Sequence, residues 1–294
     1  MVGYKKYTME KWYEKYLIMY DKPFNVVPES LVEDVRHNLD RLQSNKPEVT
    51  ISVIAYNEEK HLFACLWSLS EMICKYPVEI IGVDNDSKDC TSEIFEAVGI
   101  PFFKEYKHSC GHARLCGLNH ANGKFHVNID ADTMYPPHYV DIMINSLKKR
   151  NVVGASSLWS YISDKQHSQI KLFFYELTRD IFLYIQAFKR PELSVRGLVF
   201  AYKVDVARKV GIRTDIIRGE DGYLAFQLKE FGRIIFVRNK EARAVTGYGT
   251  VGVDGSMFNS FKVRIINSMK VIGRIFYSKS KYEDRDDNLI NKDK

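Results

Sequence analysis

The sequence has 294 residues, of which 45% are hydrophobic and 27% charged, and its formal net charge is +6. This length allows one large domain or two small ones with a substantial core. The positive charge suits anionic ligands, but no RNA- or DNA-binding signature accompanies it, so we expect no nucleic-acid partner. Five cysteines without a CxxC pair argue against a disulfide framework and favour a reducing, cytoplasmic compartment.

The first segment, residues 1–46, is predicted to be a helical N-terminal extension. In the first part of this extension, aromatic and apolar residues recur at helical spacing: Trp12, Tyr13, Tyr16, Leu17 and Tyr20. A second amphipathic stretch of the extension runs from Pro28 to about Leu42.

Residues 47–250 are predicted to form one α/β domain. Its apolar, β-branched runs alternate with helical patterns, which predicts a Rossmann-like, mostly parallel central sheet flanked by helices. The expected strands are Val49–Ala55, Val78–Val83, Pro101–Lys104, Phe125–Ile129, Leu198–Tyr202 and Ile234–Val237. The expected helices follow Glu59, Lys88, Gly111, Ile170 and Gly219.

The last segment, residues 251–294, is predicted to contain an amphipathic basic helix and a disordered tail. Residues 261–277 combine apolar side chains with lysines and arginines, which predicts peripheral contact with the inner face of a membrane. Packing against the domain is the alternative. No apolar run reaches the ~20 residues of a membrane-spanning helix, and no signal-peptide core is present.

Polar clusters follow three of the predicted strands. They are Tyr56-Asn57-Glu58, Asp84-Asn85-Asp86 and Asp130-Ala131-Asp132. Ligands of open α/β sheets bind outside the carboxyl ends of the strands, so we expect these clusters to meet at one edge.

The cluster Asp130-Ala131-Asp132 is a candidate metal site. In an extended segment, side chains two residues apart point the same way. Paired carboxylates suit Mg²⁺ or Mn²⁺, which bind through one or two carboxylates together with substrate phosphates. This pattern predicts a metal that neutralises a nucleotide diphosphate.

Three further groups of residues are candidates for ligand binding or catalysis. Asp84 and Asn85 can accept hydrogen bonds from a base or ribose, although a turn or helix cap is also expected there. Arg114, early in a helix, can pair with phosphate or base. Glu220 and Asp221 begin a helix, and because adjacent helical residues diverge by about 100°, we expect only one of them to face the site.

The order of these motifs resembles the family 2 glycosyltransferases. The motifs are TISVIAYNEE, VEIIGVDNDSKDCT, the glycine-bounded GHARLCGLNHANG, the strand entering Asp130-Ala131-Asp132, and the Gly219-Glu220-Asp221 helix. The resemblance covers roughly residues 49–247. It implies the GT-A fold, a nucleotide-diphosphate sugar donor, and transfer with inversion at the anomeric carbon.

The resemblance also assigns roles to individual residues. Asn85 stands at the base-reading position, where many members carry aspartate, and Asp221 matches the general base. The remaining positions that match donor-binding residues are Ala55, Tyr56, Asn57, Glu58, Asp84, Arg114, Asp130 and Ala131, and the metal ligands are Asp132 and Asp130. Gly197 and residues 198–203 resemble the acceptor-side strand, whereas residues 153–196 have no counterpart in the motifs and leave the acceptor open.

The sequence therefore predicts a metal-dependent, inverting transfer of sugar to a glycan or lipid-linked acceptor, in surface polysaccharide or glycoconjugate synthesis. A polyprenyl-phosphate glycosyltransferase at the membrane is one alternative. A sugar-nucleotide-binding protein without activity is another. A nucleotidyltransferase would carry a glycine-rich basic loop after the first strand, where this chain has the acidic Tyr56-Asn57-Glu58-Glu59.

Overall fold

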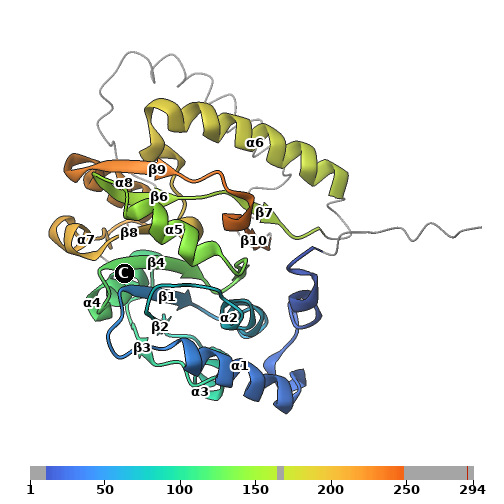
Figure 1. Ribbon diagram of the computed structural model, residues 1–294. Coiled ribbons are helices and arrows are strands. Elements are labelled where there is room, and N and C mark those ends of the chain that lie inside the picture. The colour runs from blue at the N-terminus through green and yellow to red at the C-terminus, as the bar shows by residue number, and fades with distance from the viewer. Residues whose placement is uncertain (1–10, 164–168, 248–289, 291–294) are drawn as a thin grey trace, which may run out of the picture.

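The computed structural model describes residues 11–163, 169–247 and 290. Its centre is a seven-stranded sheet with the strand order β3-β2-β1-β4-β8-β6-β9 (Figure 1). The strands are β1 (Val49–Ala55), β2 (Val78–Asp84), β3 (Phe102–Lys104), β4 (Phe125–Asp130), β6 (Val152–Ser156), β8 (Phe200–Lys203) and β9 (Arg233–Phe236). Only β8 runs antiparallel to its neighbours, so the predicted mostly parallel sheet is confirmed.

The middle of the sheet explains where a ligand would bind. Every β1 residue except Ile54 is buried, as expected of a parallel strand covered on both faces. The chain proceeds from β1 through β2 to β3, and then returns to place β4 on the other side of β1. The crevice between β1 and β4 is therefore a topological switch point, the usual ligand position in such sheets.

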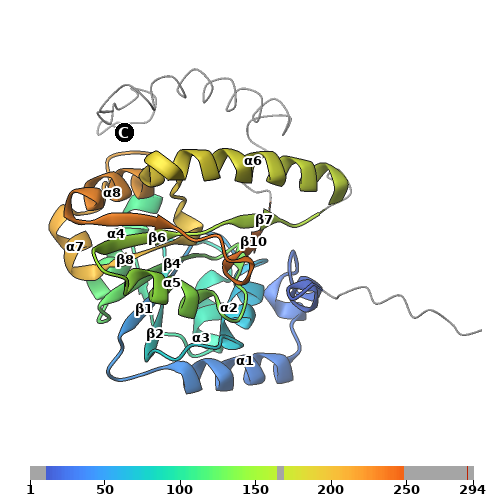
Figure 2. The same cartoon turned by 45° about the horizontal axis from the view of Figure 1, so that its top comes forward.

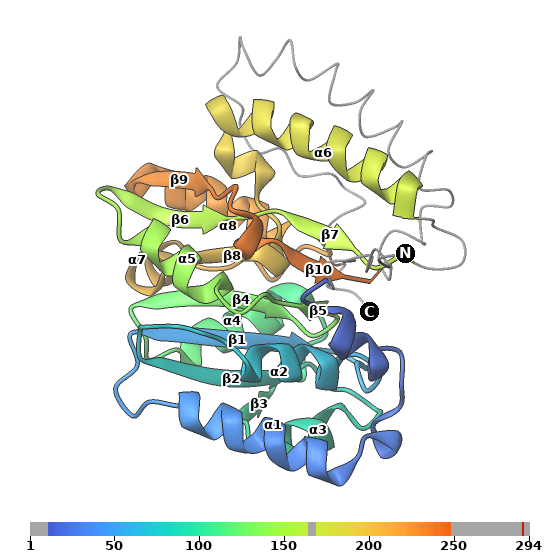
Figure 3. The same cartoon turned by 45° about the vertical axis from the view of Figure 1, so that its right-hand side comes forward.

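Helices cover both faces of the sheet (Figures 1 and 3). Four helices share one hydrophobic core: α1 (Glu29–Leu42), α2 (Leu62–Ser70), α3 (Thr91–Ala97) and α5 (Tyr139–Leu147). Apolar side chains of three more form a second core on the opposite face: α4 (Cys110–His120), α7 (Val204–Val210) and α8 (Glu220–Leu228).

A second sheet of three short strands connects the main sheet to α6 (Gln169–Lys189). Its order is β5-β10-β7, formed by β5 (Thr133–Met134), β10 (Ala244–Thr246) and β7 (Trp159–Tyr161). Figures 2 and 3 show α6 beyond these strands, at the end of the molecule opposite α1. Short 3₁₀ helices fill the connections: Glu14–Ile18, Phe24–Val26, Pro191–Ser194, Gly197–Val199, Lys229–Phe231 and Lys240–Ala242.

The structure describes most of the N-terminal extension but not the segment predicted to form a basic helix near the C-terminus. The described part of the N-terminal extension contains two 3₁₀ helices and α1, and Tyr16 and Tyr20 are buried against the domain. The predicted basic helix at 261–277 lies outside the described residues. None of the helices in the described part of the chain combines the length and apolar character needed to cross a bilayer.

Candidate active site

The register of the central strands brings the predicted polar clusters to one edge. Ala55 pairs with Asp84, and Ile54 pairs with Asp130, so β1, β2 and β4 end side by side. The convergence expected from the sequence is therefore present.

The loops that follow β1 and β2 are bonded to each other. Asn57 has a φ of 54°, a left-handed conformation that asparagine tolerates better than most residues. Its backbone N–H donates to Ser87 Oγ at 2.9 Å, and its side-chain oxygen accepts from the Lys88 N–H at 2.8 Å. Asp84 accepts from the Ser87 N–H at 3.0 Å. Asn57 and Asp84 therefore shape the loops.

Two hydrogen bonds hold the Asn85 side chain and leave its oxygen as an acceptor. Its Nδ2 donates to the backbone oxygens of Glu105 at 2.8 Å and Lys107 at 2.9 Å. Because both partners can only accept, the side-chain oxygen must occupy the other position of the amide. The nearby Tyr56 ring is 45% exposed and lies 3.9 Å from the His108 ring, centroid to centroid. An acceptor and an exposed aromatic surface thus lie at the predicted base-binding end.

A buried arginine joins the acidic residues of β4 and α8. Arg114, 3% exposed, donates from Nη2 to Asp130 Oδ1 at 2.8 Å. Its Nε lies 3.1 Å from the Asp221 carboxylate and 3.4 Å from Glu220 Oε1. In this structure the contacts of Arg114 are therefore with carboxylates, and its contact with phosphate or base stays a prediction.

The expectation that only one of Glu220 and Asp221 faces the site is wrong. Both are buried, and both reach Arg114. Helix α8 begins directly at Glu220, after Gly219 with a φ of 98°. The longer glutamate side chain at this first position compensates for the divergence of adjacent helical positions. A Cβ atom at Gly197 would overlap the Arg114 guanidinium and the Asp221 carboxylate, so glycine is required for this close approach.

One face of β4 is polar, and two of its three polar side chains are buried. His126, Asn128 and Asp130 alternate along the strand, so they share that face. Asn128 Nδ2 donates to Asp221 Oδ1 at 3.1 Å, and its oxygen accepts from the Tyr202 hydroxyl at 3.2 Å. Asn128 was not among the predicted site residues, although buried polar residues at period two before Asp130 were a usable signal.

Asp221 is a carboxylate in an unusual environment. Burial raises its pKa, Arg114 lowers it, and the neighbouring Glu220 and Asp130 raise it further, which leaves the pKa well above its ordinary value. A base is most efficient when its pKa lies near the working pH. The direction of this shift therefore suits a proton acceptor.

Asp130 and Asp132 do not lie along one extended segment, so that expectation is wrong. The strand β4 ends at Asp130, and residues 131–132 form a turn before β5. Burial, Asp130 and Glu58 still raise the pKa of Asp132 to about 7. Its Oδ1 accepts from Thr133 Oγ1 at 2.9 Å. A divalent cation here would relieve the crowding of negative charge, so the donor set fits Mg²⁺ or Mn²⁺.

The N-terminal extension reaches this acidic edge. The Tyr20 hydroxyl donates to the Asp132 backbone oxygen at 2.8 Å, across 112 positions of sequence. Asp21 lies 2.8 Å from His61 Nε2, and Glu58 lies 2.6 Å from His61 Nδ1. Burial lowers the pKa of His61, but the hydrogen bonds to both carboxylates outweigh it and raise that pKa to about 9. Sequence reasoning missed Tyr20 and His61, and no pattern along the chain links them to Asp132.

The described residues would supply few ligands to a metal ion. No group of three His, Cys, Asp or Glu side chains that could hold an ion occurs in the described part of the chain. Asp130 already bonds Arg114 through one oxygen, which leaves Asp132 as the principal carboxylate. Such a site resembles those in which Mg²⁺ or Mn²⁺ takes its other ligands from phosphates and water.

Solved structures share this fold. The chain is 20% identical to a mannosyltransferase of Pyrobaculum calidifontis, solved with GDP-Man and Mn²⁺, with a TM-score of 0.55 over 82% of this chain and 65% of that one. Residues 1–349 of S. aureus TarS match at 16% identity and a TM-score of 0.54, over 68% of this chain and 60% of that one. These likenesses show that the chain has the GT-A fold.

The sequence comparisons identify the family. Residues 50–211, more than half of the chain, match the model described as glycosyl transferase family 2, and the chain belongs to that family. An uncharacterized glycosyltransferase of Rickettsia prowazekii is 30% identical over 126 residues. That alignment spans 42% of this chain and 39% of the relative, so the chain covers about two-fifths of the curated protein that it matches.

Proposed function

We propose that the protein transfers a sugar from a nucleotide-diphosphate sugar to an acceptor hydroxyl, with inversion at the anomeric carbon. The observation that carries this proposal is the group of carboxylates at the β1–β4 edge. Asp130, Glu220 and Asp221 surround the guanidinium of Arg114, and Asp132 lies close to Asp130. The structural neighbours support it, because two of them are described in complex with GDP-Man and Mn²⁺ and with UDP-GlcNAc.

The donor would lie along the loops that follow β1 and β2. Tyr56 offers an exposed ring for the base, and the Asn85 oxygen offers an acceptor for a base N–H. The segment Ala55, Tyr56, Asn57 and Glu58 then leads toward the ribose and diphosphate, which would reach Asp130-Ala131-Asp132. This arrangement follows the pairing of Ala55 with Asp84 and of Ile54 with Asp130.

Asp132, with the free oxygen of Asp130, would hold Mn²⁺ or Mg²⁺. The ion would neutralise negative charge on the departing nucleotide diphosphate. The chain's own contribution is to hold the carboxylates in place. Thr133 orients the Asp132 side chain, Tyr20 fixes its backbone, and Arg114 orients Asp130.

Asp221 would accept the proton of the acceptor hydroxyl as that oxygen attacks the anomeric carbon. Arg114 and Asn128 each donate one hydrogen bond to its carboxylate. A carboxylate has about four lone-pair sites, so acceptor capacity remains for a proton. Inversion by direct displacement needs no enzyme nucleophile, which agrees with one carboxylate acting as base.

The acceptor is either a glycan or a lipid-linked molecule such as a polyprenyl phosphate, in surface polysaccharide or glycoconjugate synthesis. A cytoplasmic location, peripheral to the membrane, is part of this proposal. The predicted membrane contact through 261–277 concerns residues outside the described structure.

A thermal-shift panel tests the donor class. Nucleotide-diphosphate sugars with different bases and sugars are added with Mn²⁺, and nucleoside triphosphates serve as the comparison. Because a ligand that binds only the native state raises the melting temperature, at least one diphosphate sugar should produce a clear shift. A shift with triphosphates alone would instead favour nucleotidyl transfer and contradict the proposal.

A further inference from the structure

Helix α6 presents a long apolar surface to solvent. Eight apolar side chains at helical spacing are between 45% and 81% exposed. We call them the α6 stripe: Ile170, Phe173, Phe174, Leu177, Ile181, Tyr184, Ile185 and Phe188. Single exposed apolar residues are ordinary, but a contiguous patch of this kind marks an interaction site.

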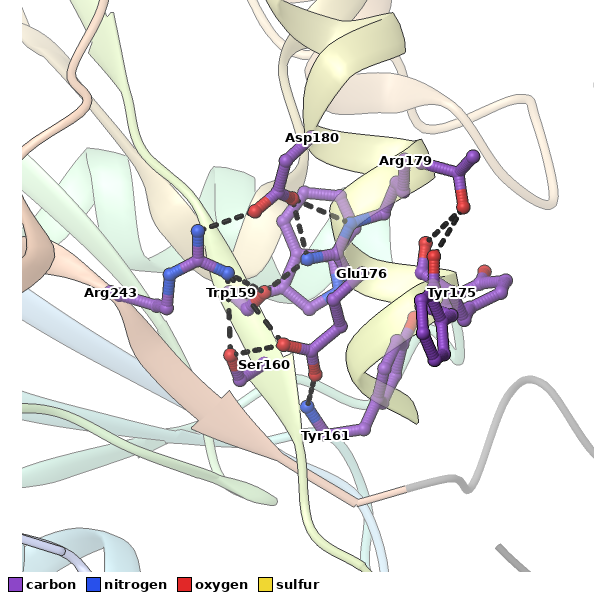
Figure 4. A network of polar contacts seen from close by, with 10 residues as sticks. Trp159, Ser160, Tyr161, Tyr175, Glu176, Arg179, Asp180 and Arg243 are labelled. Carbon is purple, nitrogen blue, oxygen red and sulfur yellow. Dashed lines mark hydrogen bonds and ion pairs between the residues drawn. The ribbon is translucent and has the colours of Figure 1, made fainter. Parts of the chain in front are cut away.

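The opposite side of α6 packs on the domain through the buried Leu172 and Leu183 and through polar contacts (Figure 4). Glu176 accepts from the Tyr161 N–H and from Ser160 Oγ, each at 2.7 Å. Arg179 lies 4.3 Å from the Trp159 ring, and Asp180 pairs with Arg243. A surface helix ordinarily buries its apolar face and exposes its charges. In α6 these three charged side chains face the protein, while the stripe faces outward.

Basic residues surround the stripe. At its first end, Ile170 and Phe173 line a hollow that includes Lys11, Lys240, Arg243 and one acid, Glu176. At its other end, Phe188 lines a hollow that includes Lys189, Lys229, Arg233 and one acid, Glu230. Near the middle, the Arg238 guanidinium lies 3.5 Å from the centroid of the Tyr184 ring. An apolar surface with a basic rim is complementary to a membrane that carries anionic lipids.

The small sheet links the edge at Asp132 to α6 (Figure 3). β5 begins directly after Asp132, β10 pairs with β5, and β7 pairs with β10. β7 in turn contacts α6, because Glu176 accepts from Ser160 and Tyr161 of that strand.

We propose that α6 lies on an anionic membrane surface, with the stripe at the boundary between headgroups and acyl chains. The surrounding lysines and arginines then contact the lipid headgroups. A helix of 21 residues offers a contact about 30 Å long. This contact does not depend on the proposed function. If that function holds, the contact brings the site within reach of a lipid-linked acceptor.

Vesicle flotation of the full chain tests the contact without any assay of transfer. The vesicles contain phosphatidylcholine with or without phosphatidylglycerol. The test variant is the double substitution Ile181→Glu, Phe188→Glu. The matched control is Ile18→Glu, Ile73→Glu, because these side chains are 60% and 58% exposed elsewhere on the molecule. Both variants change the net charge equally.

The wild type and the control should float with anionic vesicles, and less so with neutral vesicles or at high salt. The α6 variant should lose at least about tenfold in partitioning, since two apolar anchors are replaced by charges. Equal melting temperatures of the two variants show that the loss is not unfolding. In a second measurement, Phe188→Trp keeps the surface apolar. The difference between its fluorescence and that of the wild type, which contains three tryptophans, should shift to the blue with anionic vesicles.

Three results would overturn the proposal. The first is a wild type that does not float with anionic vesicles. The second is an α6 variant that floats like the control, which would assign membrane contact to residues 261–277. The third is a wild-type dimer that the α6 variant converts to a monomer without any change in flotation, which would make the stripe an interface between copies of the chain.

Discussion

Replacement of Arg114 by methionine should destabilise the folded protein in a way that depends on pH. Arg114 is buried and contacts Asp130 at 2.8 Å, Asp221 at 3.1 Å and Glu220 at 3.4 Å. Removal of one partner of a buried ion pair typically costs about 3–5 kcal/mol, because the remaining charge is left uncompensated. Since the Asp130 side chain is 30% exposed and screened by water, we expect the lower end, about 3 kcal/mol.

The pH dependence follows from the carboxylates that remain. Burial already raises the pKa of Asp221, and Arg114 opposes that shift. Without Arg114 the folded-state pKa rises further, so the folded variant binds more protons than the unfolded chain. Its unfolding free energy then increases as pH falls. The deficit relative to wild type should therefore shrink as pH falls.

Urea unfolding at several pH values measures both effects. Arg208→Met is the control, because Arg208 donates to the backbone oxygens of Leu118 and Ala121 and not to carboxylates. Its deficit should not change with pH in this way. A loss below about 1 kcal/mol for Arg114→Met, on the scale expected of exposed pairs, would refute the role of Arg114 as the charge partner of the site. A deficit independent of pH would refute it equally.

Three further changes test other parts of the site. Asp221→Asn should lower turnover at least ~100-fold with nearly unchanged donor affinity, because a base assists only the transition state; near-normal transfer would move the assignment to Glu220. Tyr20→Phe removes the hydroxyl bonded to the Asp132 carbonyl, so the Mn²⁺ concentration for half-maximal nucleotide binding should rise roughly threefold to tenfold, and an unchanged value would exclude this role. Burial and Arg114 lower the pKa of His126 in the folded protein to about 3, whereas in the unfolded chain it is about 6.5. Below about pH 6.5 the unfolded chain therefore binds a proton that the folded protein does not, and the free energy of unfolding falls. His126→Phe should remove up to about 1.4 kcal/mol of this loss per pH unit between pH 6.5 and 5, which urea unfolding would show as a flatter profile.

The strands β1, β2 and β4 and their order were predictable from the apolar pattern, whereas β6, α5 and α7 were not among the expected elements. The buried strands β1 and β2 are rich in apolar, β-branched residues, β4 alternates apolar with polar residues, and each predicted span agrees with the structure within one residue. The edge on which the polar clusters meet follows from parallel strand order alone. The short strands β5 and β10 carry too few residues to produce a recognisable period.

The contacts between distant residues were not predictable in this way. Nothing in the local sequence relates Tyr20 to Asp132, because their bond depends on how the N-terminal extension packs. The sequence placed Arg114 near the site, but three-dimensional packing decides that its contacts are carboxylates. The turn at residues 131–132 likewise depends on the pairing of β5 with β10. These are the steps at which tertiary structure decides what a motif does.

Calorimetric titration of UDP and GDP tests the central claim most directly. The wild type is titrated in Mn²⁺ and in EDTA, beside Asp132→Asn and the control Asp205→Asn, which changes an exposed acid in the first turn of α7. At least one nucleotide should bind the wild type and the control in Mn²⁺ and lose most of its affinity in EDTA, while Asp132→Asn binds weakly in both. Equal affinity in Mn²⁺ and EDTA, or unchanged metal-dependent binding by Asp132→Asn, would contradict a metal-assisted nucleotide-sugar site at this edge.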